Sequence, residues 1–454
     1  MESHCYKTRK GLDLKLQGEA GETLRELAKS EEYGIKPTDF TGIVSRLVVK
    51  PGDEVKVGTP LFVDKATERV CVVSPVSGVV SAVERGERRK LLCVRVKSDG
   101  QQAELDFSAL TNAPKIKADS TAVLELLLKS GLFAFMRQRP YDVVASPNDQ
   151  PRDIFVSTFS KMPLSCNYSF AGKGEEADFR RGLKGLAVLA PVHVGLCREL
   201  MNENWLPLEG VETNYFCGPN PLGNVGVQIN HVRPVNKGEV VWTMDAQSVA
   251  AFGRLLRTGR VDFTRVIAVA GSEIVNPSYC RLIWGTPLKD VLSGQLRRQE
   301  HVRIINGNPL VGTRSSLDDY FSAFVSEICA IPEGDNVNEA FGWAMPRLAD
   351  FSTSRTYFSW LQGKKHPYNL DCRIKGGERH MIMSGEYDRV FPMDIYANYL
   401  VKAIITGDID RQEALGIYEV APEDFAVAEF VDSSKLELQR IVREGLDLLR
   451  KENS

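Results

Sequence analysis

The sequence has no long apolar run. A membrane-spanning helix needs about 20 mainly apolar residues, but the best run here, LAVLAPVHVGLC from Leu186 to Cys197, is short and contains a proline and a histidine. The first residues, MESHCYKTRKGLDLKL, are charged and polar, whereas a secretory signal peptide has an apolar stretch there. We therefore expect a chain that neither crosses a membrane by itself nor is exported.

The chain also has no excess of positive charge and no clustered cysteines. Its 454 residues are 43% hydrophobic and 26% charged, with a formal net charge of −2. This composition excludes the basic surface that a nucleic acid requires. The nine cysteines include no C-x-x-C pair, so they predict reduced thiols in a cytoplasmic protein rather than a metal knuckle or a disulfide framework.

Common catalytic motifs are missing as well. There is no G-x-x-x-x-G-K-[ST] phosphate loop, no G-x-S-x-G turn and no H-E-x-x-H motif. The nearest glycine-rich loop, Gly223-Asn-Val-Gly226, lacks the third glycine and the acidic residue of a nucleotide site. The six histidines lack a second ligand at metal-binding spacing, and we expect His193 to be a core residue. The sequence therefore predicts no catalytic, metal or cofactor site of its own.

From Phe40, apolar residues alternate with polar ones between Gly, Pro and Asp turns, which is typical of an antiparallel all-β module. Two half-repeats, GIVSRLVVKPGDEV and SGVVSAVERGERRKLL, predict a sandwich of related halves. The segment resembles a biotinyl/lipoyl-type barrel-sandwich, in which a lysine on a hairpin carries the prosthetic group. Lys65 in LFVDKATERV has that setting. We assign residues 1–113 to this domain.

The rest of the chain predicts three further regions, which make an α/β (α+β) multidomain protein. Residues 114–260 are expected to form a Rossmann-like open α/β domain, with helices at STAVLELLLKSGLFAFM and DAQSVAAFGRLLRTG and strands at DIFVSTF and VGVQINHV. Residues 261–312 predict a β-grasp module of the soluble-ligand-binding (SLBB) type: two strands, a short helix after Thr286-Pro287, and a strand. Residues 313–454 predict a mixed α/β and helical region that ends in an amphipathic helix.

The C-terminal region has the layout of an iron–sulfur segment without its cysteines. LGIYEVAPEDFAVAEFVDSSKLELQRIV is spaced like the ferredoxin pattern C-x2-C-x2-C-x3-C, but the four ligand positions hold Pro422, Phe425, Ala428 and Asp432. No thiolate is left to bind a cluster.

These strings together resemble one family. VKPGDEV, LFVDK, SPVSGVV, RGERRKLL, FCGPNPLGNVG, VAGSEIVNP and FGWAMP, preceded by GLDLKL and followed by LGIYEVAPEDFAVAEFV, resemble the A subunits of bacterial sodium-translocating NADH:quinone oxidoreductases over nearly the whole chain. That family is distantly similar to the NADH-binding subunit of respiratory complex I and to the Rnf complex C subunit. Those proteins carry flavin or iron–sulfur centres, whereas this sequence lacks the flavin loop and the cysteines.

The resemblance implies a place in a six-subunit enzyme that oxidises NADH, reduces quinone to quinol and exports sodium across the inner membrane. FAD, FMN, riboflavin and iron–sulfur centres would lie on other subunits, and this chain would bind none of them. It would be peripheral, on the cytoplasmic face of the bacterial inner membrane. Its five partners would be the B to F subunits, of which it would mainly cap the membrane-embedded B subunit, and it would help to bind or gate quinone.

A quinone offers an apolar ring, two carbonyl acceptors and a long tail, so its site needs aromatic walls and donors. The stretch GLFAFMRQRPY, residues 131–141, offers walls at Phe133, Phe135 and Met136 and donors at Arg137, Arg139 and Tyr141. The alternative is a helix that ends in a basic surface turn. Micromolar binding needs about 8 kcal/mol and each hydrogen bond contributes only about 1 kcal/mol, so we expect the membrane-embedded partner to complete the site.

Other interpretations stay open. The stretch YGIKPTDF presents Tyr33 and Phe40 as a second quinone candidate, although it would equally serve as a loop that anchors the first strand. A lipoyl or biotin carrier that uses Lys65 is the main rival function, but no flexible linker or transferase signature accompanies the module. A purely structural adaptor differs from the preferred function only in having no contact with quinone.

Overall fold

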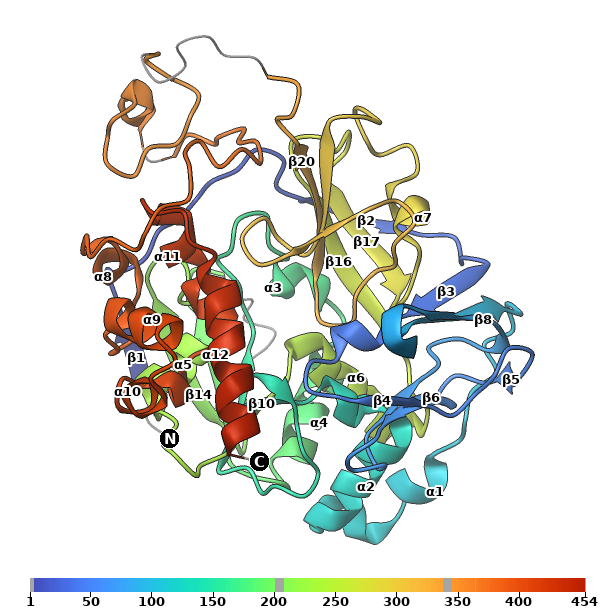
Figure 1. The fold of residues 1–454 in the computed structure, drawn as a ribbon. Coiled ribbons are helices and arrows are strands. Elements are labelled where there is room, and N and C mark those ends of the chain that lie inside the picture. Colours follow the sequence, from blue (N-terminus) through green and yellow to red (C-terminus); the bar gives the residue numbers. More distant parts are fainter. Residues whose placement is uncertain (1–3, 201–207, 338–344, 364, 454) are drawn as a thin grey trace.

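The computed structural model describes residues 4–200, 208–337, 345–363 and 365–453. Within these ranges the strands form sheets of seven, six, four and three strands. In Figure 1 the C-terminal helices, drawn in red, lie on one side of the molecule and the blue N-terminal sandwich on the other, with the six-stranded sheet toward the top. The mixed α/β fold of several domains that the sequence predicted is confirmed.

The N-terminal sandwich consists of two antiparallel sheets. One sheet has the order β3 (Glu32–Ile35), β9 (Leu91–Ser98), β8 (Gly78–Arg85), β5 (Glu54–Val55). The other has the order β4 (Ser45–Leu47), β6 (Pro60–Asp64), β7 (Cys71–Val73). The side chains of Leu61, Val94 and Val96 are fully buried, as alternation along half-buried strands predicts. The expected all-β module is confirmed.

Strands β1 and β2, within residues 4–26, do not belong to the sandwich. Strand β1 (His4–Lys7) pairs in parallel with β14 (Glu212–Cys217) at the edge of the seven-stranded sheet. Strand β2 (Gly21–Glu26) pairs with β17 (Ser278–Ile283) at the edge of the six-stranded sheet. Two strands from within residues 1–113 therefore belong to sheets of the later domains. This is possible because an extended segment can pair with any open strand edge.

The seven-stranded sheet, with the order β1-β14-β13-β12-β15-β10-β11, forms the core of the α/β domain. Its parallel centre consists of β12 (Asp153–Ser157), β13 (Val192–Cys197), β14 and β15 (Val241–Thr243). Strands β10 (Arg137–Arg139) and β11 (Val143–Val144) add an antiparallel edge. The connecting helices include α4 (Glu176–Leu186) and α5 (Val225–Val232), and α6 (Ala246–Thr258) follows β15.

Two of the element predictions for this domain need correction. VGVQINHV, predicted as a strand, is helix α5. Its apolar residues alternate as in a strand, but a chain that leaves β14 can reach the parallel strand β15 only through a crossover, and a helix is the usual one. The predicted helix through GLFAFM ends earlier: α2 covers Ser120–Ser130, and Gly131 adopts a left-handed φ of 79° that stops it. A 3-10 helix, η4 (Leu132–Phe135), follows.

The six-stranded sheet contains the predicted β-grasp elements. Strands β16 (Thr264–Ala270) and β17, the short helix α7 (Leu288–Leu292) and strand β18 (Val302–Asn306) follow in the expected order. The sheet continues past residue 312 with β19 (Thr313–Ser315) and β20 (Glu327–Pro332), and its order is β19-β18-β20-β16-β17-β2.

Short helices follow in the C-terminal region: α8 (Glu386–Val390), α9 (Ala397–Ile405), α10 (Ile409–Ala414), α11 (Ala426–Val431) and α12 (Leu438–Glu452). Helix α12 buries Leu438, Val442, Leu446 and Leu449 on one face, as its pattern predicted. The segment with the ferredoxin layout folds as the 3-10 helices η8 (Ile417–Glu419) and η9 (Pro422–Phe425), α11 and the start of α12. Phe425, at one of the former ligand positions, packs against Phe391 with ring centroids 4.9 Å apart. Within the FGWAMP string, residues 341–344 lie outside the described residues.

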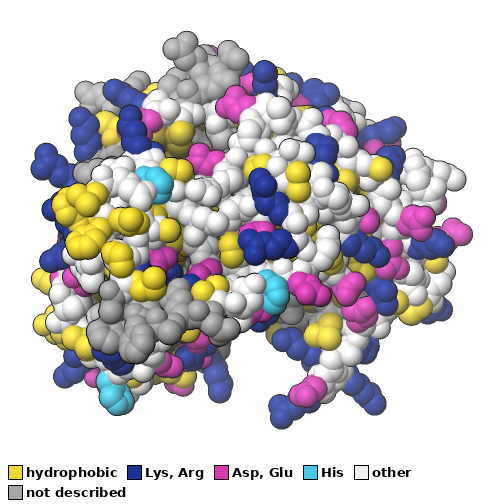
Figure 2. All heavy atoms as spheres, turned by 90° about the horizontal axis from the view of Figure 1, so that it is seen from above, with side chains coloured by type: hydrophobic (Ala, Val, Ile, Leu, Met, Phe, Trp, Pro, Cys, Tyr) yellow, Lys and Arg dark blue, Asp and Glu magenta, His cyan; other side chains and the backbone are white. Residues whose placement is uncertain are grey.

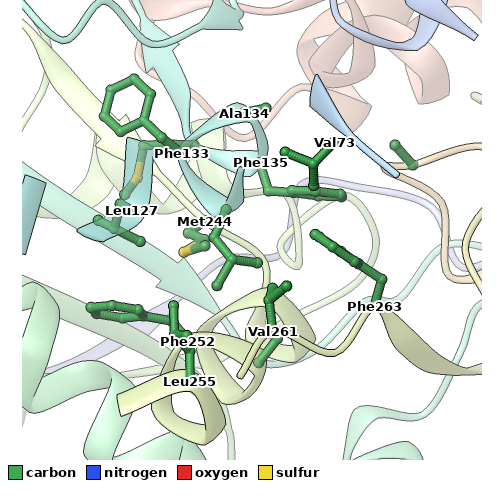
Figure 3. Close-up of a cluster of buried hydrophobic side chains, with 14 of the residues drawn as sticks. Val73, Leu127, Phe133, Ala134, Phe135, Met244, Phe252, Leu255, Val261 and Phe263 are labelled. Carbon is green, nitrogen blue, oxygen red and sulfur yellow. The ribbon is translucent and has the colours of Figure 1, made fainter. Parts of the chain in front are cut away.

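One apolar core joins the sandwich to the α/β domain. Figure 3 shows Val73 from the sandwich beside Phe135, and Leu127 near Phe133 and Met244. Phe135 stacks on Phe263, with ring centroids 5.9 Å apart. Because this core is continuous, the chain around Phe135 has a fixed position relative to both domains.

Candidate functional site

A cavity of about 220 Å³ lies where the α/β domain, the β-grasp module and the C-terminal region meet. The α/β domain contributes Ser157 and Thr243 at the carboxyl ends of β12 and β15, and Asn224 at the start of α5. The β-grasp sheet contributes the loops around Asn308 and Phe324. In open α/β sheets, ligands bind beyond the carboxyl ends of the strands, so this cavity is the candidate site.

Arg139 is the most unusual group of the cavity. Its side chain is only 3% exposed, and its Nη2 donates to Glu423 Oε1 at 3.0 Å. Its Nε and Nη1 have no hydrogen-bond partner within the described part of the chain. Burial disfavours the charged guanidinium, but Asp142 and Glu423 outweigh this and raise the pKa of Arg139. The wall of the cavity therefore holds a permanent cation, whose Nε and Nη1 are enclosed by protein and have no acceptor among the described residues.

Aromatic rings and a second arginine form another wall. The guanidinium carbon of Arg137 lies 5.4 Å from the centroid of the Phe324 ring, and its Nη2 donates to Asp142 Oδ2 at 2.7 Å. Phe135 lies beside Phe324, with centroids 5.7 Å apart. Burial raises the pKa of Asp142, but Arg137, Arg139 and Arg443 together outweigh it, so the pKa is lowered. This side of the cavity is therefore aromatic, and the ionised carboxylate of Asp142 holds Arg137 against the Phe324 ring.

Carboxyl groups with raised pKa values stand near Arg139 and on the β-grasp side. Burial raises the pKa of Asp424 from 3.8 to about 7, although Arg139 opposes this. Burial also raises the pKa of Glu327, which accepts from the Cys166 N–H at 3.2 Å and from Asn308 at 3.1 Å. Asp424 does not line the cavity, but it interacts electrostatically with Arg139, which does, so its protonation can change the charge next to the site.

The structure brings three of the predicted quinone residues together: Phe135, Arg137 and Arg139 all line the cavity. It does not bring the others there. Phe133 packs edge-on against Trp242 at 5.4 Å, and Met136 is fully buried in the same core. Phe133 lies in the 3-10 helix η4, which turns it away from Phe135. Met136 is extended, and alternate residues of an extended chain point to opposite sides, so it points away from Phe135 and Arg137.

Tyr141 and the second candidate stretch lie elsewhere. The Tyr141 hydroxyl accepts from Asn453 at 3.2 Å, near α12. Tyr33 is buried in the sandwich, where its hydroxyl accepts from the Ser30 N–H at 3.2 Å. Phe40 is buried behind the cavity wall and meets Phe324 edge-on, with centroids 5.5 Å apart. Phe40 therefore supports the wall without lining the cavity.

Lys65 lies in the turn between β6 and β7 and is exposed. Its backbone N–H donates to the Val44 carbonyl at 2.8 Å, which fixes the turn. His193, in contrast, is buried and stacks on Phe155 at 4.5 Å, which confirms the prediction of a core residue.

The weak glycine-rich loop does not offer a phosphate site. A Cβ added to Gly226 would lie 2.4 Å from an Asp424 carboxyl oxygen, and Asn224 Nδ2 donates to Asp424 Oδ1 at 3.4 Å. The chain's own carboxyl thus occupies the start of α5, where a phosphate would otherwise bind.

Sequence reasoning missed Phe324, Asn308 and Glu423, because they are far from Arg139 in the chain and belong to no motif. A larger cavity, of about 670 Å³, lies between the β-grasp sheet and α11. None of the predicted quinone residues lines it. In the described ranges, no helix is long and apolar enough to cross a membrane.

Comparisons with known proteins identify the family. Three family models match in order: the NqrA N-terminal barrel-sandwich hybrid domain at residues 6–99, the NqrA second alpha/beta domain at 118–261 and the NQRA C-terminal domain at 266–316. The A subunit of the Na(+)-translocating NADH-quinone reductase of Neisseria meningitidis serogroup A is 32% identical over 98% of this chain and 99% of its own. This chain belongs to the NqrA family. The proteins of the same name from Photorhabdus laumondii and Hahella chejuensis are 32% and 33% identical over the same shares.

As a member of the NqrA family, the chain is part of an enzyme complex, the sodium-translocating NADH:quinone reductase, and the resemblance seen in its sequence is confirmed. The three matched domains correspond to the sandwich, the α/β domain and the first part of the β-grasp sheet. Among solved structures, the NAD+-reducing [NiFe]-hydrogenase in the air-oxidized state matches with a TM-score of 0.35, 13% identity and coverage of 50% of this chain and 49% of that one. A likeness this weak says nothing about the chemistry of this NqrA protein.

Proposed function

We propose that this NqrA protein binds the quinone head group in the cavity between Arg139 and Phe324, as a peripheral component that caps the membrane-embedded B subunit on the cytoplasmic face. It holds no prosthetic group, and FAD, FMN, riboflavin and the iron–sulfur centres belong to other members of the B to F set. The observation that carries the proposal is the buried Arg139 side chain, whose Nε and Nη1 are unpaired within the described chain beside an aromatic wall.

The chemistry of the cavity fits a quinone ring. A quinone carbonyl accepts hydrogen bonds, and Arg137 and Arg139 are the two guanidinium donors in the cavity lining. The quinone ring can lie against the ring of Phe324, which also contacts Arg137 and Phe40. Reduction to quinol consumes protons, and burial raises the pKa of Asp424 to about 7, so this carboxyl, next to the lining residue Glu423 in the chain, can be protonated near neutral pH.

The size of the cavity favours a shared site. Its volume of about 220 Å³ is below the roughly 300 to 1,000 Å³ of pockets that enclose a whole small molecule. A head group fits this space, but an isoprenoid tail does not. The tail must therefore leave the cavity, and the membrane-embedded partner would supply the apolar surface for it.

The test uses the complete complex. Arg139→Lys keeps the charge but loses the planar fork, and Phe324→Leu removes the ring. We expect each to raise the KM for a short-chain quinone about ten-fold, the equivalent of one or two lost contacts. NADH oxidation with an artificial acceptor should not change, because that reaction belongs to a different polypeptide of the complex.

Tyr141→Phe is the matched control, because Tyr141 lies outside the cavity lining. If the quinone KM is unchanged in both cavity variants, in complexes that assemble normally, quinone does not bind in this cavity and the structural adaptor is the remaining function. Tight quinone binding by the isolated chain that depends on Arg139 and Tyr141 would contradict the shared site.

A further inference from the structure

An exposed apolar tip lies outside the lining of the proposed quinone cavity, in the orange segment that projects from one end of the molecule in Figure 1. It contains the 3-10 helix η7 (Phe358–Gln362). Three of its side chains are largely in solvent: Phe358 is 54% exposed, Trp360 46% and Leu361 65%. Met345 and Leu348, just before η7, are about half exposed as well. We call these five residues the apolar tip.

Hydrogen bonds hold the apolar tip in its conformation. The Phe358 N–H donates to the Pro346 carbonyl at 3.2 Å, and Gln362 Nε2 donates to the Leu348 carbonyl at 2.7 Å. Ser359 is buried between exposed neighbours. These hydrogen bonds hold η7 against the stretch around Pro346 and Leu348, while the apolar side chains of both face solvent. A contiguous exposed apolar surface of this kind marks a binding site.

The segment that carries the apolar tip has an excess of positive charge. From Met345 to Met383 the sequence has seven Lys and Arg residues against three Asp and Glu, in a chain whose net charge is −2. The carboxylates of Asp350 and Asp371 are already paired with cations of the same segment. Figure 2, which looks down on this end, shows hydrophobic side chains gathered at the left side, with Lys and Arg side chains near them at the edge of the molecule.

Two of the cations are free for an external partner. Arg355 and Lys365 have no carboxylate within ion-pair distance among the residues described by the structure, whereas their neighbours Arg347 and Arg373 do. The guanidinium of Arg355 lies 5.6 Å from the centroid of the Trp360 ring. An aromatic ring and unpaired charge therefore face solvent at the same place.

We propose that the apolar tip docks on an anionic phospholipid bilayer, with Phe358, Trp360 and Leu361 in the interface and Arg355 and Lys365 at the headgroups. Tryptophan prefers the level of the headgroups, and a few apolar side chains with basic neighbours suffice for reversible peripheral binding. A stable protein interface buries about 800 Å² and 20 to 30 residues on each partner, which is far more than five side chains. Lipid therefore fits the tip better than a protein partner.

The experiment is flotation of the full-length chain with vesicles of phosphatidylethanolamine and phosphatidylglycerol, or of phosphatidylcholine alone. The bound fraction should be about ten-fold higher on the anionic vesicles and should fall in high salt. The double variant Trp360→Ser/Leu361→Ser should reduce binding about ten-fold, and Arg355→Gln/Lys365→Gln should remove the preference for anionic lipid. Matched controls are Tyr396→Ser/Tyr399→Ser, which changes exposed aromatic residues on α9 and just before it, and Lys115→Gln/Lys117→Gln.

Brominated lipids provide a second measurement, because they should quench the fluorescence of Trp360 and not that of the Trp360→Phe variant. Equal binding to both kinds of vesicle, or tip variants that float like the controls, would overturn the proposal. So would tip variants that still float but no longer co-purify with the rest of the complex, which would make the tip a protein interface. None of these outcomes involves Arg139 or Phe324, so failure here and failure of the quinone proposal are separate results.

Discussion

Arg139 Nη2 and Glu423 Oε1 lie 3.0 Å apart although 284 positions separate them in the chain. This charged hydrogen bond joins the edge of the seven-stranded sheet to the C-terminal helical region, directly beside the cavity. It leaves Arg139 with two unpaired donors in the described chain, so the same side chain both connects the domains and offers the site its main polar group.

The two ends of this ion pair should contribute unequally to stability. Arg139→Gln leaves the carboxylate of Asp142, 8% exposed, with one arginine fewer, so we expect a loss of about 3 to 5 kcal/mol. Glu423 is 34% exposed, so Glu423→Gln should cost about 1 kcal/mol. Urea unfolding followed by circular dichroism measures both. Arg440→Gln, which breaks an exposed pair, is the control, and equal losses for the first two variants would contradict the assigned burial.

Asp424 should make stability depend on pH. Burial raises its pKa from 3.8 to about 7, whereas the unfolded chain releases this proton near the ordinary value. Between these values the folded protein binds more protons, so the contribution of Asp424 to stability falls as the pH rises through this window. Thermal unfolding from pH 4 to pH 8 should show this fall in the parent chain, relative to Asp424→Asn. Parallel pH profiles for the two proteins would show that Asp424 does not titrate in this range.

The contact between α4 and α6 should not tolerate a methyl group. A Cβ on Gly253 would lie 1.7 Å from the Asp178 carbonyl oxygen, and one on Gly182 would lie 2.0 Å from that of Val249. Alanine normally favours a helix over glycine, but here the backbones of two helices must separate. We expect Gly253→Ala to cost about 2 kcal/mol or more. Gly377→Ala, with no atom within 4 Å of the added Cβ, should change the unfolding midpoint little, and similar midpoints for both would refute the close approach.

Lys65 should be unmodified. It lies exposed in a hairpin turn, which is the position that a carrier lysine needs. Its position alone therefore does not decide between a lipoyl or biotin carrier and a chain without a prosthetic group. Intact mass spectrometry of the chain from its native source should give the mass of the bare sequence, and Lys65→Arg should leave quinone reduction by the complex unchanged. A lipoyl or biotinyl increment at Lys65 would instead establish the carrier function.

The sequence by itself determined the order of the domains and most of their elements. Alternating valines predicted the sandwich, a stripe of leucines predicted α12, and the turn at Thr286-Pro287 marked α7, because each pattern reflects contacts within a few residues. The order of its motifs was also enough to identify the family. The alternation in VGVQINHV misled, because the need for a crossover between parallel strands lies outside the segment itself.

Only the tertiary structure decided the site. The stretch of residues 131–141 pointed to the cavity, but whether a given side chain lines it depends on the backbone direction after Gly131: Phe135, Arg137 and Arg139 do, and Phe133 does not. Phe324 and Glu423 come from other domains and carry no local pattern. The sequence also did not predict which sheet edges β1 and β2 would join. The hydrogen bonds along a strand edge are made by the backbone and depend little on sequence, so long-range packing determines the edge.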